Sequence, residues 1–504
     1  MRIDTIYRYM LLMLLVVAST ETLSADSWLD KVKSGYKEVE NKITTEFSLD
    51  DKTEELALAK PLPLDVPANW HYSYFNEPIF NSQMVILEDG VQHRKTIVLV
   101  HGLGELGMKD WFNLIPKLAE QYHVIAVDLP GFGLSGVPQG RYTPTNYAKV
   151  LNAVLNQYVD SPITLVGHSM GGAISLRFAS MYPNSVDKLV LIDVAGVLEK
   201  TAFVKHISEL PIDESLVPNM LKKTIAQVND FGSSLVELGT LHDPASDFLH
   251  GNDVTWNALL SNSPNINAAL SLVEEDFNSA VRNLTVDTSI IWGAKDTVAP
   301  IRTAKVLSAN IESARLVIIE NASHVPMKSH PQEFMVELQH ALASKTVKES
   351  IVEKGKTDKS QGDLVCDNKA NMTYSGNFDA IILNQCTNIK LKEVTATSLE
   401  ANDSLVEVEN LLLVSHRIAL KADESVIRIT NGVIKGDKAI SLSGSRLDLA
   451  GVEIIGGEYT IYSDKHSQVV FSICKSESQQ FSGLLHGVYE LTETTLDELL
   501  YSSK

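Results

Sequence analysis

Cysteine and the usual signatures of metal and nucleotide chemistry are scarce in this chain. Its 504 residues include three cysteines, and all of them lie after residue 365. No His/Cys cluster has the ligand spacing of a zinc site, and we expect neither a G-x-G-x-x-G dinucleotide fingerprint nor a P-loop. We therefore expect neither a metal ion nor an organic cofactor.

Positive charge is also in deficit. The chain has 43 Lys and Arg against 63 Asp and Glu, a formal net charge of −20 at pH 7. Nucleic acids and anionic membranes bind basic patches, so we expect neither to be the main partner. The hydrophobic content of 44% indicates a globular protein with an ample core, and the length indicates roughly two to four domains.

The N-terminus has an apolar run, but a short one. Residues 10–18 are apolar and follow two arginines, whereas a transmembrane helix needs about 20 apolar residues. The pattern predicts a signal peptide over residues 1–25, removed after Ala25 or near Ala18, and hence a protein exported to the periplasm or the medium. An uncleaved N-terminal anchor is the alternative.

Changes in composition divide the rest of the chain. Apolar residues at helical spacing and then three prolines predict an amphipathic helix and a linker over residues 26–69. A charged stretch poor in aromatics predicts an exposed linker over residues 346–362. We therefore expect the segment after this linker to be independent of the chemistry of the segment before it, and to end in a tail over residues 477–504.

Between residues 70 and 345, short apolar runs alternate with helical stretches. The runs cover residues 96–100, 124–127, 163–166, 188–192, 289–292 and 315–319. Uninterrupted apolar strands of this kind predict the α/β class, with a doubly wound, mostly parallel sheet covered on both faces. Functional side chains are expected at the carboxyl ends of such strands. A polar, helical insertion at about 198–284 is long enough to cap a site there.

Residues 363–476 instead show short β segments at a period of about 20 residues. Apolar pairs recur in column at Ile389/Leu391, Val406/Val408, Ile427/Ile429, Leu447/Leu449 and Val469/Phe471. The period predicts a parallel β-solenoid, and a β-sandwich is the alternative because the repeat is imperfect. Cys366 and Cys386 are one period apart, which puts them within disulfide reach in adjacent coils about 4.8 Å apart. Free buried thiols are the alternative.

One stretch, residues 163–172, carries the strongest chemical signal. The apolar run Ile163–Val166 leads into Gly167-His168-Ser169-Met170-Gly171, and a helical pattern follows. Glycine two residues either side of Ser169 fits a strand-to-helix turn that is too tight for side chains. Such a turn exposes the serine hydroxyl and places the Met170 N–H at a helix N-terminus, where it can stabilise developing negative charge.

Residues 70–345 as a whole resemble the α/β-hydrolase family, because four motifs occur in the order of that family. They are the elbow around Ser169, the turn His101-Gly102-Leu103-Gly104, the acid loop 291–300 and the histidine loop 321–326. The resemblance implies a serine nucleophile, and implies that the backbone N–H groups of Leu103 and Met170 form the oxyanion hole. Serine rather than aspartate at the nucleophile position disfavours the dehalogenase and epoxide-hydrolase branches.

The nucleophile needs a base, and the base needs an orienting acid. His324, one loop after the run 315–319, is the expected base, and Asp296 is the expected acid. Asp193 also ends a strand and is the alternative acid. We expect Asp128, at the end of another strand, to be structural.

The sequence therefore predicts an exported serine hydrolase that cleaves small carboxylic esters or related acyl compounds through an acyl-enzyme. The β-solenoid would bind envelope, glycan or a protein partner. The alternatives are a non-catalytic binding scaffold and a carbon–carbon bond hydrolase with the same three residues.

Overall fold

The computed structural model describes residues 55–198, 256–257, 260, 263–343 and 359–502. The expected signal peptide, the helix that follows it, most of the expected cap and most of the 346–362 linker lie outside these residues. Within the described ranges, no helix combines the length and apolarity needed to cross a bilayer.

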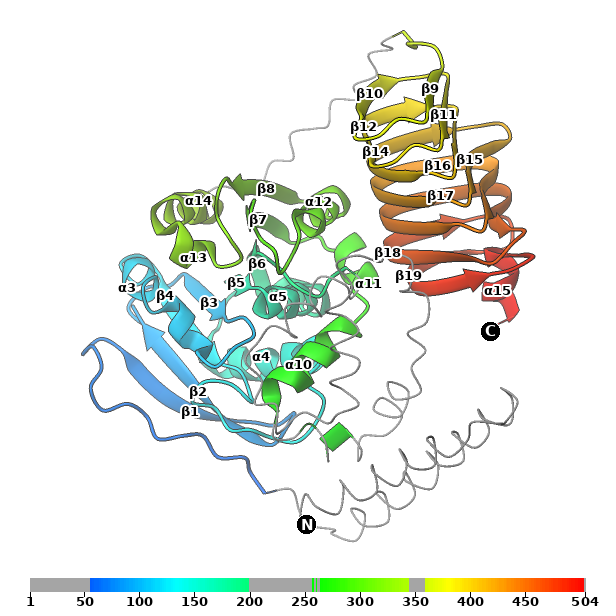
Figure 1. The fold of residues 1–504 in the computed structure, drawn as a ribbon. Coiled ribbons are helices and arrows are strands. Elements are labelled where there is room, and N and C mark those ends of the chain that lie inside the picture. The colour runs from blue at the N-terminus through cyan, green and yellow to red at the C-terminus, as the bar shows by residue number, and fades with distance from the viewer. Residues whose placement is uncertain (1–54, 199–255, 258–259, 261–262, 344–358, 503–504) are drawn as a thin grey trace, which may run out of the picture.

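The first half of the described chain is built on an eight-stranded sheet with the order β1-β2-β4-β3-β5-β6-β7-β8 (Figure 1). β1 and β2 run antiparallel to their neighbours, and the other six strands are parallel. The strands are β1 (His71–Glu77), β2 (Ser82–Asp89), β3 (Thr96–Val100), β4 (His123–Asp128), β5 (Ile163–His168), β6 (Val186–Ile192), β7 (Asp287–Gly293) and β8 (Ala314–Ile319).

Helices cover both faces of this sheet, which explains why its strands are uninterrupted apolar runs. All five residues of β3 are buried. The edge strand β1 has only two buried residues, Phe75 and Glu77, and its other residues are partly or fully exposed. One face packs on α4 (Pro144–Tyr158), α5 (Met170–Met181) and α12 (Ile301–Asn310). The other face packs on α3 (Ile115–Leu118) and α14 (Pro331–Ala343). The expected mostly parallel α/β sheet is confirmed.

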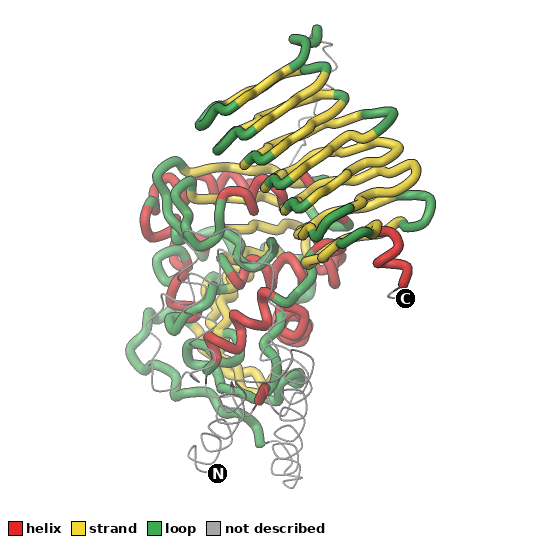
Figure 2. Tube along the Cα trace, turned by 45° about the vertical axis from the view of Figure 1, so that its right-hand side comes forward, coloured by secondary structure: helices red, strands yellow, loops and turns green. Residues whose placement is uncertain are grey.

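The second half of the described chain is rich in β structure, and its strands stack side by side (Figure 2). Its strands are β9 (Leu364–Asp367), β10 (Thr373–Asn377), β11 (Ala380–Asn384), β12 (Ile389–Ala396), β13 (Ser398–Asn402), β14 (Leu405–Val414), β15 (Ile418–Asp423), β16 (Val426–Ser443), β17 (Arg446–Ser463), β18 (Ser467–Glu477), β19 (Ser482–Leu491) and β20 (Thr494–Thr495). All pairs from β9 to β18 are parallel. β19 closes the stack antiparallel to β18, and α15 (Leu496–Ser502) packs on β17.

The apolar pairs seen in the sequence do fall into one column. Ile389 pairs with Val406, and in succession Ile427, Leu447 and Val469 continue the same line. Cys366 and Cys386 form a disulfide, with their Cα atoms 6.6 Å apart. The remaining cysteine, Cys474, is a free and buried thiol.

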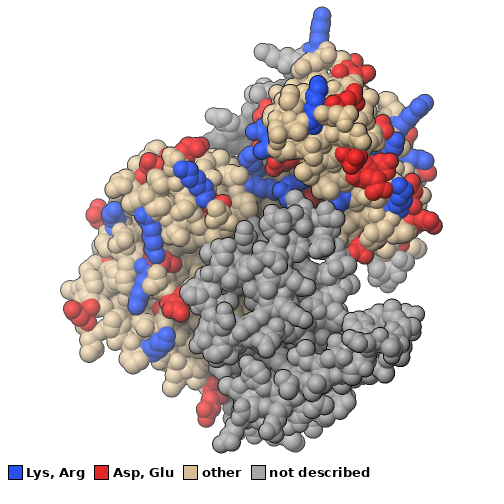
Figure 3. All heavy atoms as spheres, in the orientation of Figure 1, with Lys and Arg blue, Asp and Glu red and all other residues tan. Residues whose placement is uncertain are grey.

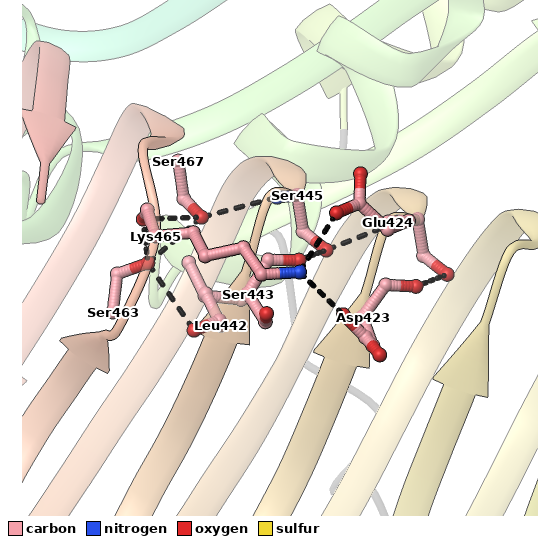
Figure 4. A network of polar contacts seen from close by, with 9 residues as sticks. Asp423, Glu424, Leu442, Ser443, Ser445, Ser463, Lys465 and Ser467 are labelled. Atoms are coloured by element: carbon pink, nitrogen blue, oxygen red, sulfur yellow. Dashed lines mark hydrogen bonds and ion pairs between the residues drawn. The ribbon is translucent and has the colours of Figure 1, made fainter.

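A ladder of serines joins successive turns of this β-rich region (Figure 4). The Ser445 N–H donates to Ser467 Oγ, and the Ser425 N–H donates to Ser445 Oγ, each at 3.0 Å. The Ser404 N–H donates to Ser425 Oγ in the same way. Each buried backbone donor thus meets the hydroxyl one turn further along, which satisfies polar groups inside the stack.

Candidate active site

A sharp turn between β5 and α5 presents Ser169. The serine has φ 53° and ψ −121°, a backbone conformation that L-residues seldom adopt. A Cβ on Gly171 would lie 2.3 Å from the carbonyl oxygens of Val100 and His101, and one on Gly167 would lie 2.3 Å from the Gly171 carbonyl oxygen. The expectation that only glycine fits on either side of Ser169 is therefore confirmed.

Three of the expected site residues meet in one hydrogen-bonded chain. His324 Nε2 lies 2.9 Å from Ser169 Oγ, and His324 Nδ1 lies 2.8 Å from Asp296 Oδ2. His324 follows β8 and Asp296 follows β7, so each comes from a loop at the carboxyl end of a parallel strand. This arrangement can move a proton from the serine hydroxyl to the imidazole while a carboxylate faces the opposite nitrogen.

Asp296 is held as a carboxylate. Its Oδ1 accepts hydrogen bonds from the N–H groups of Val298 (2.8 Å) and Ala299 (2.9 Å). Burial alone would raise its pKa, but the bonds from His324 and Ala299 outweigh burial and lower that pKa. The side chain is therefore charged where it faces the imidazole.

Asp193, the alternative acid, interacts with Asp296, and the hydrogen bond to His324 Nδ1 is made by Asp296. It follows β6, is fully buried, and accepts one hydrogen bond from the Gly293 N–H at 2.9 Å. Burial, and then the charge of Asp296, raise the pKa of Asp193 well above its ordinary value. Of the two acids, Asp193 keeps its proton and Asp296 loses it.

His168 holds the histidine loop by a hydrogen bond to its backbone. Its Nε2 lies 2.7 Å from the backbone oxygen of His324, and the two rings are 5.0 Å apart. Burial, reinforced by the positive charge that His324 can carry, lowers the pKa of His168 to about 3. The side chain is therefore neutral and donates its Nε2–H to the His324 carbonyl.

The turn expected to supply one oxyanion donor lies directly against Ser169. A Cβ on Gly102 would come within 3.0 Å of Ser169 Cβ, so Leu103 follows at close range. His101 is buried and braces this turn, because its Nδ1 bonds the Gly102 carbonyl (2.7 Å) and its Nε2 accepts from the Leu129 N–H (3.1 Å). Met170 is the first residue of α5. Leu103 is thus one residue from a close contact with Ser169, and Met170 follows the serine directly in the chain.

The chain was expected to lack a dinucleotide fingerprint, yet two stretches, residues 102–107 and 131–136, have its G-x-G-x-x-G glycine spacing. In a nucleotide-binding turn, the N–H groups of such a loop face a phosphate. Here the Met108 and Leu134 N–H groups donate to the two carboxylate oxygens of Asp128, at 2.7 and 2.8 Å. Asp128 thus ties both glycine turns together, the structural role expected of it.

Within the described residues, no three His, Cys, Asp or Glu side chains cluster as metal ligands would.

The described part of the expected cap includes α10 (Pro264–Val273). Asn267 on this helix accepts from Trp256 Nε1 (3.0 Å) and donates to the Gly140 carbonyl (2.8 Å). Helix α10 is therefore anchored on the loop before α4.

Comparisons with known proteins find similarity to proteins of the α/β-hydrolase fold. Residues 95–229 match the family model described as the alpha/beta hydrolase fold. The chain is 26% identical over 262 residues to an uncharacterised protein of Mycobacterium tuberculosis, covering 47% of this chain and 72% of that one. It is 27% identical over 245 residues to the pimeloyl-(acyl-carrier protein) methyl ester esterase of Neisseria meningitidis serogroup C, covering 48% of this chain and 90% of that one.

Among solved structures, an esterase from Exiguobacterium antarcticum aligns with a TM-score of 0.42 and 22% identity, over 54% of this chain and 99% of its own. The family-model match and the strand order together show that this chain carries a domain with the α/β-hydrolase fold, and its sequence relatives include an ester hydrolase.

Proposed function

We propose that this protein is an exported serine hydrolase that cleaves carboxylic esters or related acyl compounds through an acyl-enzyme. The observation that carries the proposal is the chain of contacts from Ser169 Oγ through His324 to Asp296 Oδ2. A serine hydroxyl is a weak nucleophile at neutral pH, and a histidine within hydrogen-bond reach activates it.

In the proposed reaction, Ser169 Oγ attacks the ester carbonyl while His324 Nε2 takes its proton. The oxyanion that forms accepts hydrogen bonds from the N–H groups of Leu103 and Met170, each worth about 3–4 kcal/mol in the transition state. His324 then gives its proton to the leaving alcohol, and water attacks the acyl-enzyme by the same route. Asp296 holds the imidazole tautomer and stabilises its positive charge.

Two features support export. Residues 1–25 have the composition of a signal peptide. The Cys366–Cys386 disulfide also fits an oxidising compartment, because cytosolic thiols are kept reduced.

We also propose that the β-rich region is a parallel β-solenoid that binds envelope, glycan or a protein partner. The pairing of β9 through β18 is parallel, whereas the two sheets of a β-sandwich are predominantly antiparallel. Successive pairs such as Val406–Ile427 and Ile427–Leu447 are 21 and 20 residues apart (427 − 406 and 447 − 427), close to one coil each. Acidic and basic side chains both reach the surface of this region (Figure 3).

A fluorophosphonate probe tests the catalytic proposal directly, because it reacts only with an activated serine. We expect the wild-type protein to be labelled and to hydrolyse a panel of p-nitrophenyl esters of graded chain length. Ser169→Ala should abolish labelling and lower turnover by several orders of magnitude. Labelling that survives in the Ser169→Ala variant, or its absence from folded wild-type protein, would overturn the proposal.

A further inference from the structure

Helices α11 (Asn278–Arg282) and α12 form the contact between the hydrolase-fold domain and the β-rich region. Asn278 is fully buried there, and its Nδ2 donates to the carbonyls of Cys474 (2.8 Å) and Leu485 (2.9 Å). Ala450 and Ile473 of the β-rich region belong to the same buried apolar cluster as the core of the domain. These contacts argue against the expectation that the β-rich region is independent of the chemistry of the domain.

The β-rich region meets the helices along a column of strand bends. Asn431, Gly451 and Ile473 have φ values of 57°, 69° and 55° on successive strands. Asn431 Nδ2 donates to the Lys305 carbonyl at 3.1 Å, and the Ile473 carbonyl accepts from Arg282 Nη2 at 2.7 Å. At these bends, one side-chain amide of the β-rich region bonds to α12 and one backbone carbonyl bonds to α11.

Arg302, in the first turn of α12, makes the densest set of bonds at this junction. Its Nη1 and Nη2 donate to the two carboxylate oxygens of Asp448 at 2.8 and 2.9 Å. Its Nε donates to Thr430 Oγ1 at 2.9 Å, and Nη2 also reaches the Ile429 carbonyl at 3.0 Å. Burial would raise the pKa of Asp448, but Arg302 and Arg428 lower it, so the pair is ionic. A two-pronged bond of this kind fixes both position and direction.

α12 is also the direct continuation of the acid loop. Arg302 is six residues after Asp296 (302 − 296), and the N–H groups that hold Asp296 Oδ1 belong to Val298 and Ala299. The Ala299 carbonyl in turn accepts from Trp292 Nε1 at 2.9 Å. A shift of the first turn of α12 would therefore move the donors that orient Asp296.

We infer that the β-rich region helps to position the acid of the active site, and that Arg302 is the positioning residue through which it does so. The inference rests on the proposed serine-hydrolase function. Arg302 touches none of the reacting groups, and it acts by anchoring α12 to Asp448. Misplacement of a catalytic group by about 1 Å can cost about 10²-fold in rate, so loss of this anchor should be visible in turnover.

The test compares two substitutions at the same junction in the full-length protein. Arg302→Met should lower kcat on a short-chain p-nitrophenyl ester by roughly tenfold with little change in KM, because substrate contacts are untouched. Arg282→Met is the matched control: it also removes an arginine bond to the β-rich region, but from α11, and should leave kcat within about twofold. Thermal unfolding of each variant reports the shared loss of stability.

A double-mutant cycle with Asp296→Asn separates positioning from general loosening. If Arg302 acts through Asp296, Arg302→Met should change the fluorophosphonate labelling rate by less than about twofold in the Asp296→Asn background. Equal effects in both backgrounds, or equal kcat for Arg302→Met and Arg282→Met, would overturn the inference.

Two further results are informative. If Arg302→Met does not fold, Asp448→Asn tests the same bond from the β-rich side, and normal kcat in that variant also counts against the inference. If wild-type protein shows no Ser169-dependent labelling, the proposed function is wrong and the inference falls with it. Labelled wild-type protein with unaffected Arg302 and Asp448 variants overturns the inference alone.

Discussion

The His168 ring holds the loop of His324 by a single hydrogen bond to its backbone, from Nε2 to the carbonyl oxygen at 2.7 Å. His168 is next to the nucleophile in sequence, and His324 is 156 residues further along. The residue that precedes the serine thus positions the proposed base, while the serine itself meets the imidazole of that base at 2.9 Å. Both contacts converge on one loop.

The first prediction uses the buried, neutral state of His168. Its pKa is about 3 in the folded protein, against about 6.5 in an unfolded chain. Between these values the unfolded chain binds one proton more, so stability falls as the pH drops from about 6.5. Between pH 6.5 and pH 5 the wild-type protein should lose about 2 kcal/mol more than His168→Phe, as measured by urea unfolding. Equal losses would mean that His168 ionises freely when folded.

The second prediction separates the two acids. Asp296→Asn should lower kcat by about 10⁴, because the imidazole loses control of its tautomer. Asp193→Asn should lower it far less, because an asparagine can still accept from the Gly293 N–H. Steady-state kinetics on one ester, with matched far-UV circular dichroism spectra, decides the matter. The reverse ranking would move the acid to Asp193.

Asp193 also makes a prediction about stability. An unfolded Asp ionises near pH 3.9, whereas the folded pKa of Asp193 is raised well above that value. From about pH 4 upward the folded state therefore binds more protons, and this site lowers stability as the pH rises toward the folded pKa. Asp193→Asn should therefore gain stability relative to wild type as the pH rises from about 4.5 to about 6.5, as measured by urea unfolding. A constant difference across that range would contradict the buried, protonated state.

The sequence predicted that Ser169, His324 and Asp296 would meet, and it could do so because the determinants of that contact are local. Glycines on either side of Ser169, and short loops after apolar strands, specify where each side chain must lie. The expected strand over residues 96–100 matches β3, and the run 188–192 lies within β6. Buried parallel strands are easy to recognise because both of their faces are apolar.

The junction with the β-rich region could not be predicted in the same way. Arg302 and Asp448 are 146 residues apart, and each looks like an ordinary surface charge in its own segment. Only the three-dimensional register of the strand bends brings them together. The charged stretch between the two halves led instead to the expectation that they are independent.

A fourth prediction concerns the backbone of the nucleophile. Ser169 has φ 53° and ψ −121°, a region that costs a residue with a Cβ on the order of 1–3 kcal/mol. Glycine carries no such penalty, although it gains about 0.4–1 kcal/mol of unfolded-state entropy. Ser169→Gly should therefore be about 1 kcal/mol more stable than Ser169→Ala, with both variants inactive. Thermal melting of the pair tests this, and a less stable glycine variant would show that the elbow is not strained.

The last prediction is that the hydrolase-fold domain does not stand alone. Removing every residue after Ala343 takes away the acceptors of Asn278 and Arg282 and the ionic partner of Arg302. It also exposes the part of the apolar cluster that Ala450 and Ile473 cover. A buried polar group that loses its partner costs about 1–3 kcal/mol if it stays buried, and domains of this size are only about 5–15 kcal/mol stable. We therefore expect the truncated protein to melt at least several degrees lower, or to aggregate, and to show a lower kcat on short-chain esters. If the truncated protein has the melting temperature and kcat/KM of the full chain, the β-rich region is an independent module and this prediction is wrong.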